Sequence, residues 1–570
     1  MTGEYSSFKV SNVIIILSDA QELRQINEEL ESLEKQIENL NERKMQLKRK
    51  KQCLQENIKA QTLALQSSTD QLDRQDHLWS KELSEKQSSV FGISDLRPLQ
   101  LSTMNLTLSN KNCILVMPTG GGKSLCFQLP ALLSKGVTLV ISPLVSLMED
   151  QLFALENLNI SAAMLNASST KEHVKFVHSE MTSTKSDLRL LYVTPEKLAK
   201  SKRFMSYLEK MYTQNRLARF AIDEVHCCSQ WGHDFRPDYK FLGILKRQFP
   251  KAPILGLTAT ATSSVLNDVK KILQIPDCVI LKASFNRANL FYEVRPKPSN
   301  AHALVEEIVD LIQTRFRDQS GIVYCLTQKD SEEMARQLQS HGLTAACYHA
   351  QMDAKHRSLA HRKWTTNKIQ VVVATIAFGM GIDKPNVRFV IHHTISKSME
   401  NYYQESGRAG RDDQTAHCIV FRGFADLFRQ STMVFSEQTG QEKLYSMLDY
   451  VNDLSTCRRA LIARHFGETW KSSDCQEKCD NCQRKTSVTS FNCYSFAKNL
   501  INILSKTSKI QRYTGLKLLD AWMAQKPCLQ EKKLSRSQCE MIIMQLITNG
   551  YLKEDYHFTP YSTISYLIPG

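Results

Sequence analysis

The sequence predicts an α/β protein in which two open parallel sheets, each covered by helices on both faces, follow one another along the chain. Short β-branched runs alternate with helical stretches over residues 91–285, and the same alternation recurs over 300–425. A glycine-rich loop follows an early strand in the first region only. From residue 445 onward helical patterns dominate, interrupted by a cysteine cluster. We therefore expect two successive α/β lobes followed by smaller helical units.

Composition limits both the number of domains and the class of partner. A chain of 570 residues is too long for one hydrophobic core, and about 150 residues per domain predicts three or four units. The net charge of +15, from 73 Lys+Arg against 58 Asp+Glu, indicates a polyanionic partner, either nucleic acid or an acidic membrane. No apolar run approaches the ~18 residues that cross a bilayer. We therefore expect no membrane partner.

The chain also carries the features expected of an intracellular protein. The apolar run at 13–17 lacks the length and the basic flank of a signal peptide. Lys48-Arg49-Lys50-Lys51 reads as an import signal or a phosphate contact, or equally as a solvated helix face. We expect a location in the nucleus. In such a compartment the 16 cysteines are more readily metal ligands than disulfides.

Residues 1–66 are predicted to form an N-terminal helical, coiled-coil segment. Apolar residues recur at alternating spacings of four and three, at Leu23, Ile26, Leu30, Leu33, Ile37, Leu40, Leu47, Leu54, Ile58 and Leu65. This heptad seam favours self-association, although Lys44 and Lys51 interrupt it. The alternative is a long solvated helix folded back on the body. A Ser/Gln-rich stretch then predicts a linker over 67–90.

The expected strands fall into two groups. In the first lobe they are Ile114–Met117, Val137–Ser142, Leu188–Val193, Phe220–Ile222 and Ile254–Leu257. In the second lobe they are Gly321–Cys325, Ala345–Tyr348, Val371–Ala374, Phe389–His392 and His417–Phe421. Because they read as apolar runs rather than alternating ones, both faces of each sheet should be covered.

A glycine-rich loop between an expected strand and helix predicts phosphate binding. Thr119, Gly120, Gly121 and Gly122 let successive N–H groups point at one anion. Lys123 adds a positive charge for the β- and γ-phosphates, and the Ser124 hydroxyl can bind Mg²⁺. Met117 stands where the usual pattern has its first glycine, so the strand–loop–helix context supports the assignment. We expect a nucleotide site, with ATP and Mg²⁺.

Two adjacent carboxylates follow another apolar strand about a hundred residues later. Strand alternation would send Asp223 and Glu224 to opposite faces, so that each can take a different role. Asp223 can reach Mg²⁺, and Glu224 can orient or deprotonate the water that attacks the γ-phosphate. A solvated turn is the alternative for an isolated Asp-Glu pair. Its place after the phosphate loop, at the end of an expected neighbouring strand, favours catalysis.

Further polar residues flank this expected site. The amide of Gln100 can read an adenine edge, with Arg97 beside it. Late in the second lobe, Arg408 and Arg411 are three residues apart at an expected helix start, hence on one side. From there they can reach the γ-phosphate across the cleft, as an arginine finger does. We expect these two arginines to be catalytic and to couple hydrolysis to lobe closure.

Four cysteines predict a metal centre. Cys475, Cys479 and Cys482 place three thiolates within eight residues, and Cys457 precedes them on an expected helix. Four soft ligands suit tetrahedral Zn²⁺, and without an open coordination position the metal should be structural.

Taken together, these segments resemble the motor of superfamily-two helicases, specifically the RecQ family. The matching segments are Arg97/Gln100, Thr119–Ser124, Ser142–Leu144, Thr194–Glu196, Asp223–His226, Thr258–Thr262, Ala374–Pro385 and Gln404–Arg411. The resemblance implies RecA-like lobes at 91–285 and 286–440, a zinc-binding module at 441–485 and a winged-helix domain at 486–570. It also implies an ATP-dependent DNA helicase that moves 3′ to 5′ and acts in DNA repair, replication or recombination.

Two segments are expected to contact single-stranded and duplex DNA. Residues 227–237 resemble the aromatic-rich loop of this family, in which Trp231 and Phe235 can stack on bases while Arg236 meets a phosphate. In the winged helix, residues 552–559 are the expected strand-separating hairpin, with Tyr556 or Phe558 stacking on the last base pair. For these aromatic residues, burial in the core is the alternative.

The sequence is also compatible with two other functions. An RNA helicase could use the same motor, although the aromatic-rich loop and the four cysteines argue against it. A DNA-binding or strand-annealing scaffold, in which ATP only switches the assembly, is compatible with the heptads and the positive charge.

Overall fold

The computed structural model describes residues 72–230, 234–379, 384–484, 488, 492–507, 512–524 and 534–570, together with Ile26, Asn27, Leu30 and Leu33. The chain divides into a unit of residues 1–66 and a unit of residues 67–570. In the first unit the four described residues are helical, and Ile26, Leu30 and Leu33 are 50%, 52% and 47% exposed. The remainder of the heptad seam lies outside the described residues, and the coiled coil stays a prediction.

The first lobe is a seven-stranded sheet in which all pairs are parallel. Its strands are β1 Cys113–Val116, β2 Val137–Ile141, β3 Ala162–Leu165, β4 Leu190–Val193, β5 Leu217–Ile222, β6 Ile254–Thr258 and β7 Val279–Lys282. Their order is β3-β4-β2-β5-β6-β1-β7. The five expected strands are confirmed, and β3 and β7 are additional. Every residue of β1, β2, β4 and β6 is buried, as expected for a sheet covered on both faces.

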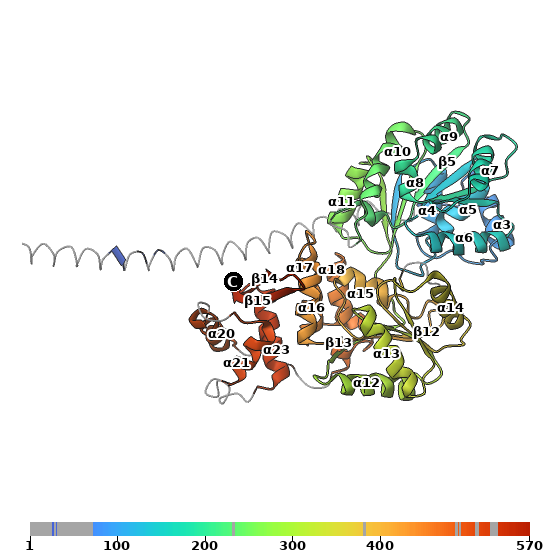
Figure 1. Ribbon diagram of the computed structural model, residues 1–570. Coiled ribbons are helices and arrows are strands. Elements are labelled where there is room, and N and C mark those ends of the chain that lie inside the picture. Colours follow the sequence, from blue (N-terminus) through green and yellow to red (C-terminus); the bar gives the residue numbers. More distant parts are fainter. Residues whose placement is uncertain are drawn as a thin grey trace, which may run out of the picture. The chain divides into compact units, whose positions relative to one another are not determined.

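Helices of the first lobe cover this sheet (Figure 1). They are α4 Gln100–Leu108, α5 Leu125–Leu133, α6 Val145–Asn157, α7 Lys171–Thr182, α8 Pro195–Lys200, α9 Lys202–Thr213, α10 Gly243–Gln248 and α11 Ser263–Ile272, with short 3₁₀ turns at Val225–Cys228 and Pro237–Leu242. Helix α11 shows how the sequence determines them, because Thr262 caps its first turn and Val265, Leu266 and Val269 form its buried face.

The second lobe repeats the architecture with six parallel strands. They are β8 Leu290–Pro296, β9 Ser320–Tyr324, β10 Ala345–Tyr348, β11 Val371–Ala374, β12 Val387–His392 and β13 Ala416–Arg422, in the order β10-β11-β9-β12-β13-β8. Helices α12 Ala301–Asp310, α13 Gln328–Ser340, α14 Ala354–Thr365 and α15 Met399–Ser406 connect them, with a π-helical turn at Leu311–Arg315. All five expected strands are confirmed, and β8 is additional.

A helical region follows the second sheet. It comprises α16 Phe424–Val434, α17 Gly440–Asn452, α18 Arg458–His465, a 3₁₀ turn at Ser472–Cys475, and α19 Asp480–Gln483. The last segment contributes, in its described part, α20 Tyr494–Thr507, α21 Gly515–Ala524, α23 Arg536–Thr548 and an antiparallel pair of β14 Leu552–Phe558 and β15 Thr563–Pro569. This order of helices and hairpin agrees with the expected winged helix, whose identification stays a prediction.

The expected linker over 67–90 is wrong for its second half. Helix α3, Ser80–Ser89, lies there and packs against α5, with Leu83 and Gln87 buried. Just before it, the Trp79 indole N–H donates to Asn105 Oδ1 at 3.0 Å. The linker was predicted because the segment is rich in Ser and Gln, and only a few of its side chains anchor the helix. Over the described part of the chain, no helix has the combination of length and apolarity that would let it cross a membrane.

Candidate active site and metal centre

The phosphate loop adopts a backbone that its glycines make possible. Gly120 and Gly122 have φ of +79° and +86°, in the left-handed region that other residues rarely adopt. Gly121 is needed for space, because a Cβ there would lie 2.5 Å from Met117 Cγ. Met117, the residue out of pattern, is thus buried beneath the loop. Ser124 is the N-cap residue of α5, so the loop leads into a helix N-terminus as predicted.

Lys123 lies at the centre of a group of charges. Its Nζ donates to the carbonyl oxygen of Met117 at 3.0 Å, within the loop itself. Burial lowers the pKa of Lys123, while Glu224 and Asp223 oppose that shift and Arg411 adds to it. The charged residues predicted from segments far apart in the sequence are therefore close enough to influence one ammonium group.

The two carboxylates are positioned by a turn rather than by strand alternation. Strand β5 ends at Ile222, and Glu224 has a φ of +48°. The tight turn is held by the Glu224 N–H, which donates to Asp223 Oδ1 at 3.0 Å. Burial and Glu224 raise the pKa of Asp223, and Lys123 opposes the shift. The expectation that β5 neighbours β1 is wrong, because β6 lies between them.

The turn that follows β5 also holds a histidine with no predicted role of its own, in the 3₁₀ turn Val225–Cys228. His226 Nδ1 lies 2.9 Å from Thr258 Oγ1, at the end of β6, and 3.2 Å from Glu224 Oε2. His226 is buried. It therefore links the carboxylate turn to the threonine segment that follows β6.

The adenine-reading amide is turned toward the phosphate loop in this structure. Gln100 is buried, and its Nε2 donates to the carbonyl of Gly122 at 2.9 Å. Its Oε1 accepts from the Arg97 N–H at 2.7 Å, and the Arg97 guanidinium donates to the carbonyl of Gly120. Arg97 and Gln100 thus lie beside the loop as predicted. With both ends of the amide engaged, their base-reading role stays a prediction.

The paired arginines follow a helix instead of starting one. Helix α15 ends at Ser406, and Arg408 and Arg411 lie in the turn beyond it. Arg408 is buried and its Nε donates to Tyr324 Oη at 2.7 Å. Arg411 reaches the first lobe, since a Cβ on Gly120 would lie 3.1 Å from its Cγ. The prediction that this segment faces the phosphate loop agrees with the position of Arg411.

Arg287 makes a cross-lobe contact that was not predicted from the sequence. It lies between β7 and β8, and its guanidinium donates to the carbonyls of Gly407, Ala409 and Gly410 at 3.4, 3.2 and 2.7 Å. The same group donates to the carbonyl of Thr119 at 3.2 Å. It therefore ties the phosphate loop to the arginine turn. A single arginine in a loop offers no pattern from which this could be predicted.

The four predicted cysteines converge. The sulfur atoms of Cys457, Cys475, Cys479 and Cys482 all lie within 4.8 Å of one another. Tetrahedral Zn–S bonds of about 2.3 Å place ligand sulfurs about 3.8 Å apart, so the donor set fits Zn²⁺. All four are free thiols. Cys457 is the N-cap residue of α18 rather than lying within it, and Cys479 is the N-cap residue of α19.

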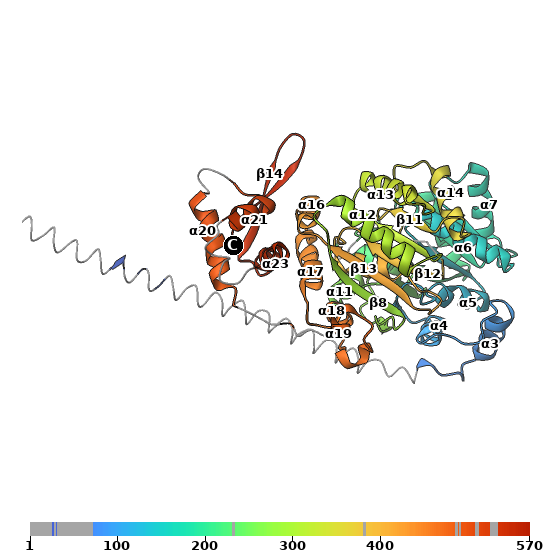
Figure 2. The same cartoon turned by 90° about the horizontal axis from the view of Figure 1, so that it is seen from below.

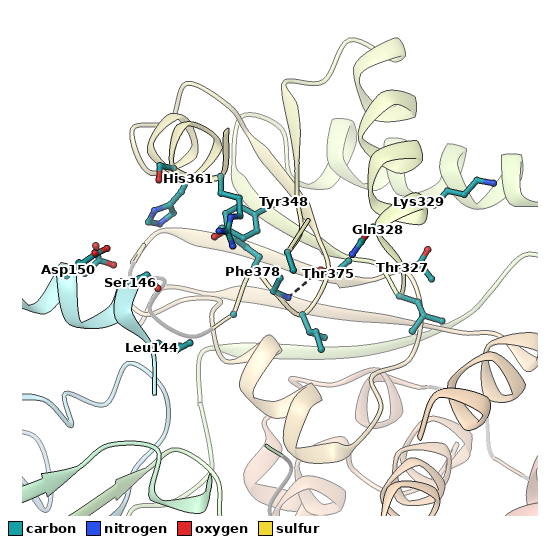
Figure 3. Close-up of a pocket in the computed structure, with 18 of the residues that line it drawn as sticks. Leu144, Ser146, Asp150, Thr327, Gln328, Lys329, Tyr348, His361, Thr375 and Phe378 are labelled. Atoms are coloured by element: carbon teal, nitrogen blue, oxygen red, sulfur yellow. Dashed lines mark hydrogen bonds between the residues drawn. The ribbon is translucent and has the colours of Figure 1, made fainter. Parts of the chain in front are cut away.

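A cavity of about 1110 Å³ opens between the two lobes. Figure 3 shows Leu144, Ser146 and Asp150 of the first lobe across from Tyr348 and His361 of the second. Arg236 also lines it, with its Nη1 donating to the carbonyl of Pro143 at 3.1 Å. Phe235 lies under the Lys240 ammonium, 5.2 Å from the ring centre. Trp231, the third predicted DNA-binding residue of this loop, lies outside the described residues.

Residues 552–559, predicted to form the whole hairpin, supply only its first strand, β14, which pairs with β15, and the aromatic residues there differ in accessibility. The Tyr556 ring stacks on Phe435 at 5.1 Å, and its hydroxyl accepts from Gln441. Phe558 is 63% exposed, and Tyr561, at the tip between β14 and β15, is 98% exposed. Tyr556 is therefore engaged within the protein. The expected hairpin segment ended at residue 559, and so Tyr561 was not predicted.

Three family models match consecutive parts of the chain. The model described as DEAD/DEAH box helicase matches residues 97–269. The helicase conserved C-terminal domain matches 302–413, and the RecQ zinc-binding model matches 424–483. These ranges fall on the first lobe, the second lobe and the helices around the four cysteines.

Curated relatives match along most of the chain. The ATP-dependent DNA helicase Q1 of Pongo abelii is 55% identical over 527 residues, which cover 91% of this chain and 81% of the relative. A putative ATP-dependent DNA helicase Q1 of Caenorhabditis elegans is 50% identical over 88% of this chain and 81% of its own length. The solved structure of Mycobacterium smegmatis helicase Lhr bound to ssDNA and AMP-PNP matches with a TM-score of 0.50 at 16% identity, covering 87% of this chain and 60% of that one. That structural match supports the fold alone.

Proposed function

The chain belongs to the RecQ family of ATP-dependent DNA helicases, and from this membership we propose that it moves 3′ to 5′ on single-stranded DNA and separates the duplex ahead of it. The family brings with it ATP and Mg²⁺ at the motor and Zn²⁺ at the four cysteines. The RNA-helicase alternative is thereby set aside. The observation that best supports an ATP-driven motor is the meeting of the two lobes at the phosphate loop, where Arg411 lies beside Gly120 and Arg287 donates to the carbonyl of Thr119.

In this proposal each residue of the loop binds or orients the nucleotide. Backbone amides of residues 119–122 and the Lys123 ammonium bind the β- and γ-phosphates. Lys123 exchanges its contact with the Met117 carbonyl for a phosphate oxygen. Ser124 and Asp223 are the residues that would hold Mg²⁺, which would supply positive charge against the negative charge that develops on the phosphates. Glu224, kept in place by its turn and by His226, orients the attacking water.

The arginine turn completes the site when the lobes close. Arg411, which lies beside Gly120, extends toward the γ-phosphate. Arg408, in the same turn as Arg411, is held in place by its hydrogen bond to the hydroxyl of Tyr324. Such a donor acts on charge that develops in the transition state. Because the two arginines belong to the second lobe, hydrolysis depends on closure. Because hydrolysis requires the closed lobes, each ATP turnover is coupled to a closing and reopening of the lobes, which moves the protein along DNA.

We assign the cavity between the lobes to single-stranded DNA. Its lining combines Arg236, Arg357 and His361 with the partly exposed ring of Tyr348, and it also includes Glu149 and Asp150. Cationic groups meet the backbone, while aromatic faces stack on bases without sequence preference. Arg236 connects this cavity to the segment that follows the catalytic carboxylates. Occupation by DNA can thus be relayed to the ATP site.

We assign strand separation to the hairpin tip. Tyr561 is the most exposed aromatic side chain there, and Phe558, the last residue of β14, is also exposed. A ring stacking on the last base pair is worth about 1–3 kcal/mol per base. Tyr561→Ala should therefore reduce unwinding, and Tyr556, engaged with Phe435, should contribute less by direct stacking.

The cellular setting extends the same proposal. A DNA motor of this family would act in the nucleus, in DNA repair, replication or recombination. The net charge of +15 favours a strand-annealing activity in addition, because it reduces repulsion between two phosphate backbones. Mixing complementary strands with protein, with and without ATP, tests annealing. Self-association is assigned to the heptad seam of residues 1–66.

The decisive experiment uses two DNA duplexes, one with a single-stranded 3′ tail and the other with a single-stranded 5′ tail. We expect ATP-dependent unwinding of the 3′-tailed substrate only. Unwinding of the 5′-tailed substrate alone would overturn the proposed polarity. Stimulation of ATP hydrolysis without any unwinding would overturn the helicase assignment in favour of an ATP-switched scaffold.

A further inference from the structure

We propose that Glu554, on β14, is a positioning residue that fixes the strand-separating hairpin to helices α16 and α17, so that the hairpin moves as one body with the second lobe. The inference rests on the proposed function of the hairpin, residues 552–569, in splitting the duplex. Figure 1 shows β14 beside α16 and α17, and Figure 2 shows the hairpin projecting from α21 and α23. Side chains from both strands and both helices meet at its base.

Glu554 is bound by hydroxyl groups from three different elements. Its Oε2 accepts from Ser431 on α16 and, at 2.6 Å, from Ser565 on β15. Its Oε1 accepts from the hydroxyl of Tyr445, on α17, at 3.0 Å. Burial raises the pKa of Glu554, and these hydrogen bonds oppose the shift. One carboxyl group therefore joins both strands of the hairpin to both helices.

A second attachment lies further along the same strand face. Residues i, i+2 and i+4 of a strand point to one side, so Glu554, Tyr556 and Phe558 share a face. Phe435, which follows α16, contacts the Tyr556 ring at 5.1 Å and the Phe558 ring at 5.4 Å. Gln441 on α17 donates to the Tyr556 hydroxyl. This face of β14 is therefore held by the hydrogen bonds of Glu554 and by the ring contacts with Phe435.

The domain that carries the hairpin approaches the same helices closely. A Cβ on Gly515, at the start of α21, would lie 2.0 Å from the Phe428 ring on α16. A two-stranded hairpin is marginally stable by itself and needs packing to hold one orientation. The tip at Tyr561 has no such packing, since it is 98% exposed. Its direction is therefore set by packing of β14 and β15 against α20, α21 and α23 in the same domain and, toward α16 and α17, by the attachment at Glu554 and Phe435.

This arrangement separates two activities. Among the described residues, none of the hydrogen-bond or aromatic contacts of Glu554, Tyr556 and Phe435 involves the phosphate loop or the lining of the inter-lobe cavity. Loosening the hairpin should leave DNA-stimulated ATP hydrolysis unchanged and uncouple it from strand separation. General destabilisation of the fold would instead reduce both.

The test is Glu554→Gln in the full chain. The amide keeps the size of the side chain but loses the charge and one acceptor oxygen. Glu442→Gln is the matched control, because it removes the same charge from an exposed side chain on α17, outside the hairpin. With the 3′-tailed duplex we expect Glu554→Gln to lower the unwinding rate about tenfold, as the loss of one charge-assisted hydrogen bond would. ATP hydrolysis on single-stranded DNA should stay within about twofold of the unmodified protein.

Two further measurements decide whether the effect comes from this contact. Ser431→Ala combined with Glu554→Gln should be no worse than the stronger single variant, because both remove the same interaction. Amide hydrogen exchange should become faster in residues 552–569 and remain unchanged in the two lobes. Additive effects of the two substitutions, or exchange that is faster throughout, would overturn the assignment.

Tyr561→Ala separates this inference from the proposed function. If Tyr561→Ala abolishes unwinding while Glu554→Gln unwinds normally, the hairpin role stands and the positioning role is refuted. If Tyr561→Ala unwinds normally, the proposed role of the hairpin fails, and the positioning role fails with it. Loss of unwinding in both variants, with ATP hydrolysis retained, supports the two together.

Discussion

Asp480→Asn is expected to release zinc through loss of one buried countercharge. Arg458 has a side chain that is 0% exposed, and it follows the ligand Cys457. Its Nε and Nη2 donate to the two carboxylate oxygens of Asp480 at 2.8 and 3.0 Å. Asp480 in turn follows the ligand Cys479, and its Oδ2 accepts from the Val294 N–H at 3.1 Å. The pair therefore braces two zinc ligands and fastens them to β8.

The magnitude follows from the burial of this pair. Removing one partner of a buried ion pair costs about 3–5 kcal/mol, because the remaining charge is left without compensation. Two unit charges about 4 Å apart attract by about 4 kcal/mol at an effective dielectric constant of 20, which lies within the range for removal of one partner. At about 1.4 kcal/mol per tenfold change, the equilibrium for opening of the cysteine-bearing segment should rise by roughly two to four powers of ten.

The assay is the rate of zinc release to a coloured chelator, with zinc content of the purified protein as the starting value. Asp474→Asn is the matched control, since Asp474 is exposed and precedes the ligand Cys475. It removes the same charge and should release zinc at the unmodified rate. If Asp480→Asn releases zinc within about threefold of the control, the buried pair does not brace the site and its burial does not govern zinc retention.

Three further outcomes test other parts of the molecule. Lys123→Ala should lower DNA-stimulated ATP turnover by about 10²–10³-fold with zinc content unchanged, and robust turnover would refute the nucleotide site. Gly122→Ala should weaken nucleotide binding in a titration, because φ is +86° and the new Cβ would lie 2.5 Å from Gln100 Nε2; Gly92→Ala, at a positive φ in open space, should bind normally. Deleting residues 1–66 should lower the number of subunits per particle, obtained by light scattering, and an unchanged number would exclude the seam as the oligomer contact.

Much of the fold could be predicted because it depends on local pattern. Apolar runs indicate buried parallel strands wherever they occur, so all ten expected strands are present in the structure. The strands that were missed have mixed burial. In β3 every second residue is partly exposed, and β7 and β8 are largely half-buried, although Val279–Leu281 in β7 is itself an apolar run. Helix α3 was missed for the same reason, since only a few side chains anchor it.

The site could be predicted in content but not in arrangement. Local spacing determines a phosphate loop or a cysteine cluster, because their ligand atoms come from a few neighbouring residues. Strand order is a property of the whole sheet, and the sequence contains no sign that β6 separates β1 from β5. The position of Arg408 could not be predicted either, because it depends on the residue at which α15 ends.

By itself, the sequence determined which chemical groups this protein has: the loop from Thr119 to Ser124, the carboxylates at 223 and 224, the paired arginines and the four cysteines. Tertiary structure alone decided which of them meet. Arg287 joins the phosphate loop to the arginine turn, and Glu554 joins the hairpin to α16 and α17. The physical reason is that a side chain's partners across a fold depend on how sheets and helices stack, and that stacking leaves no periodic pattern near the residue itself.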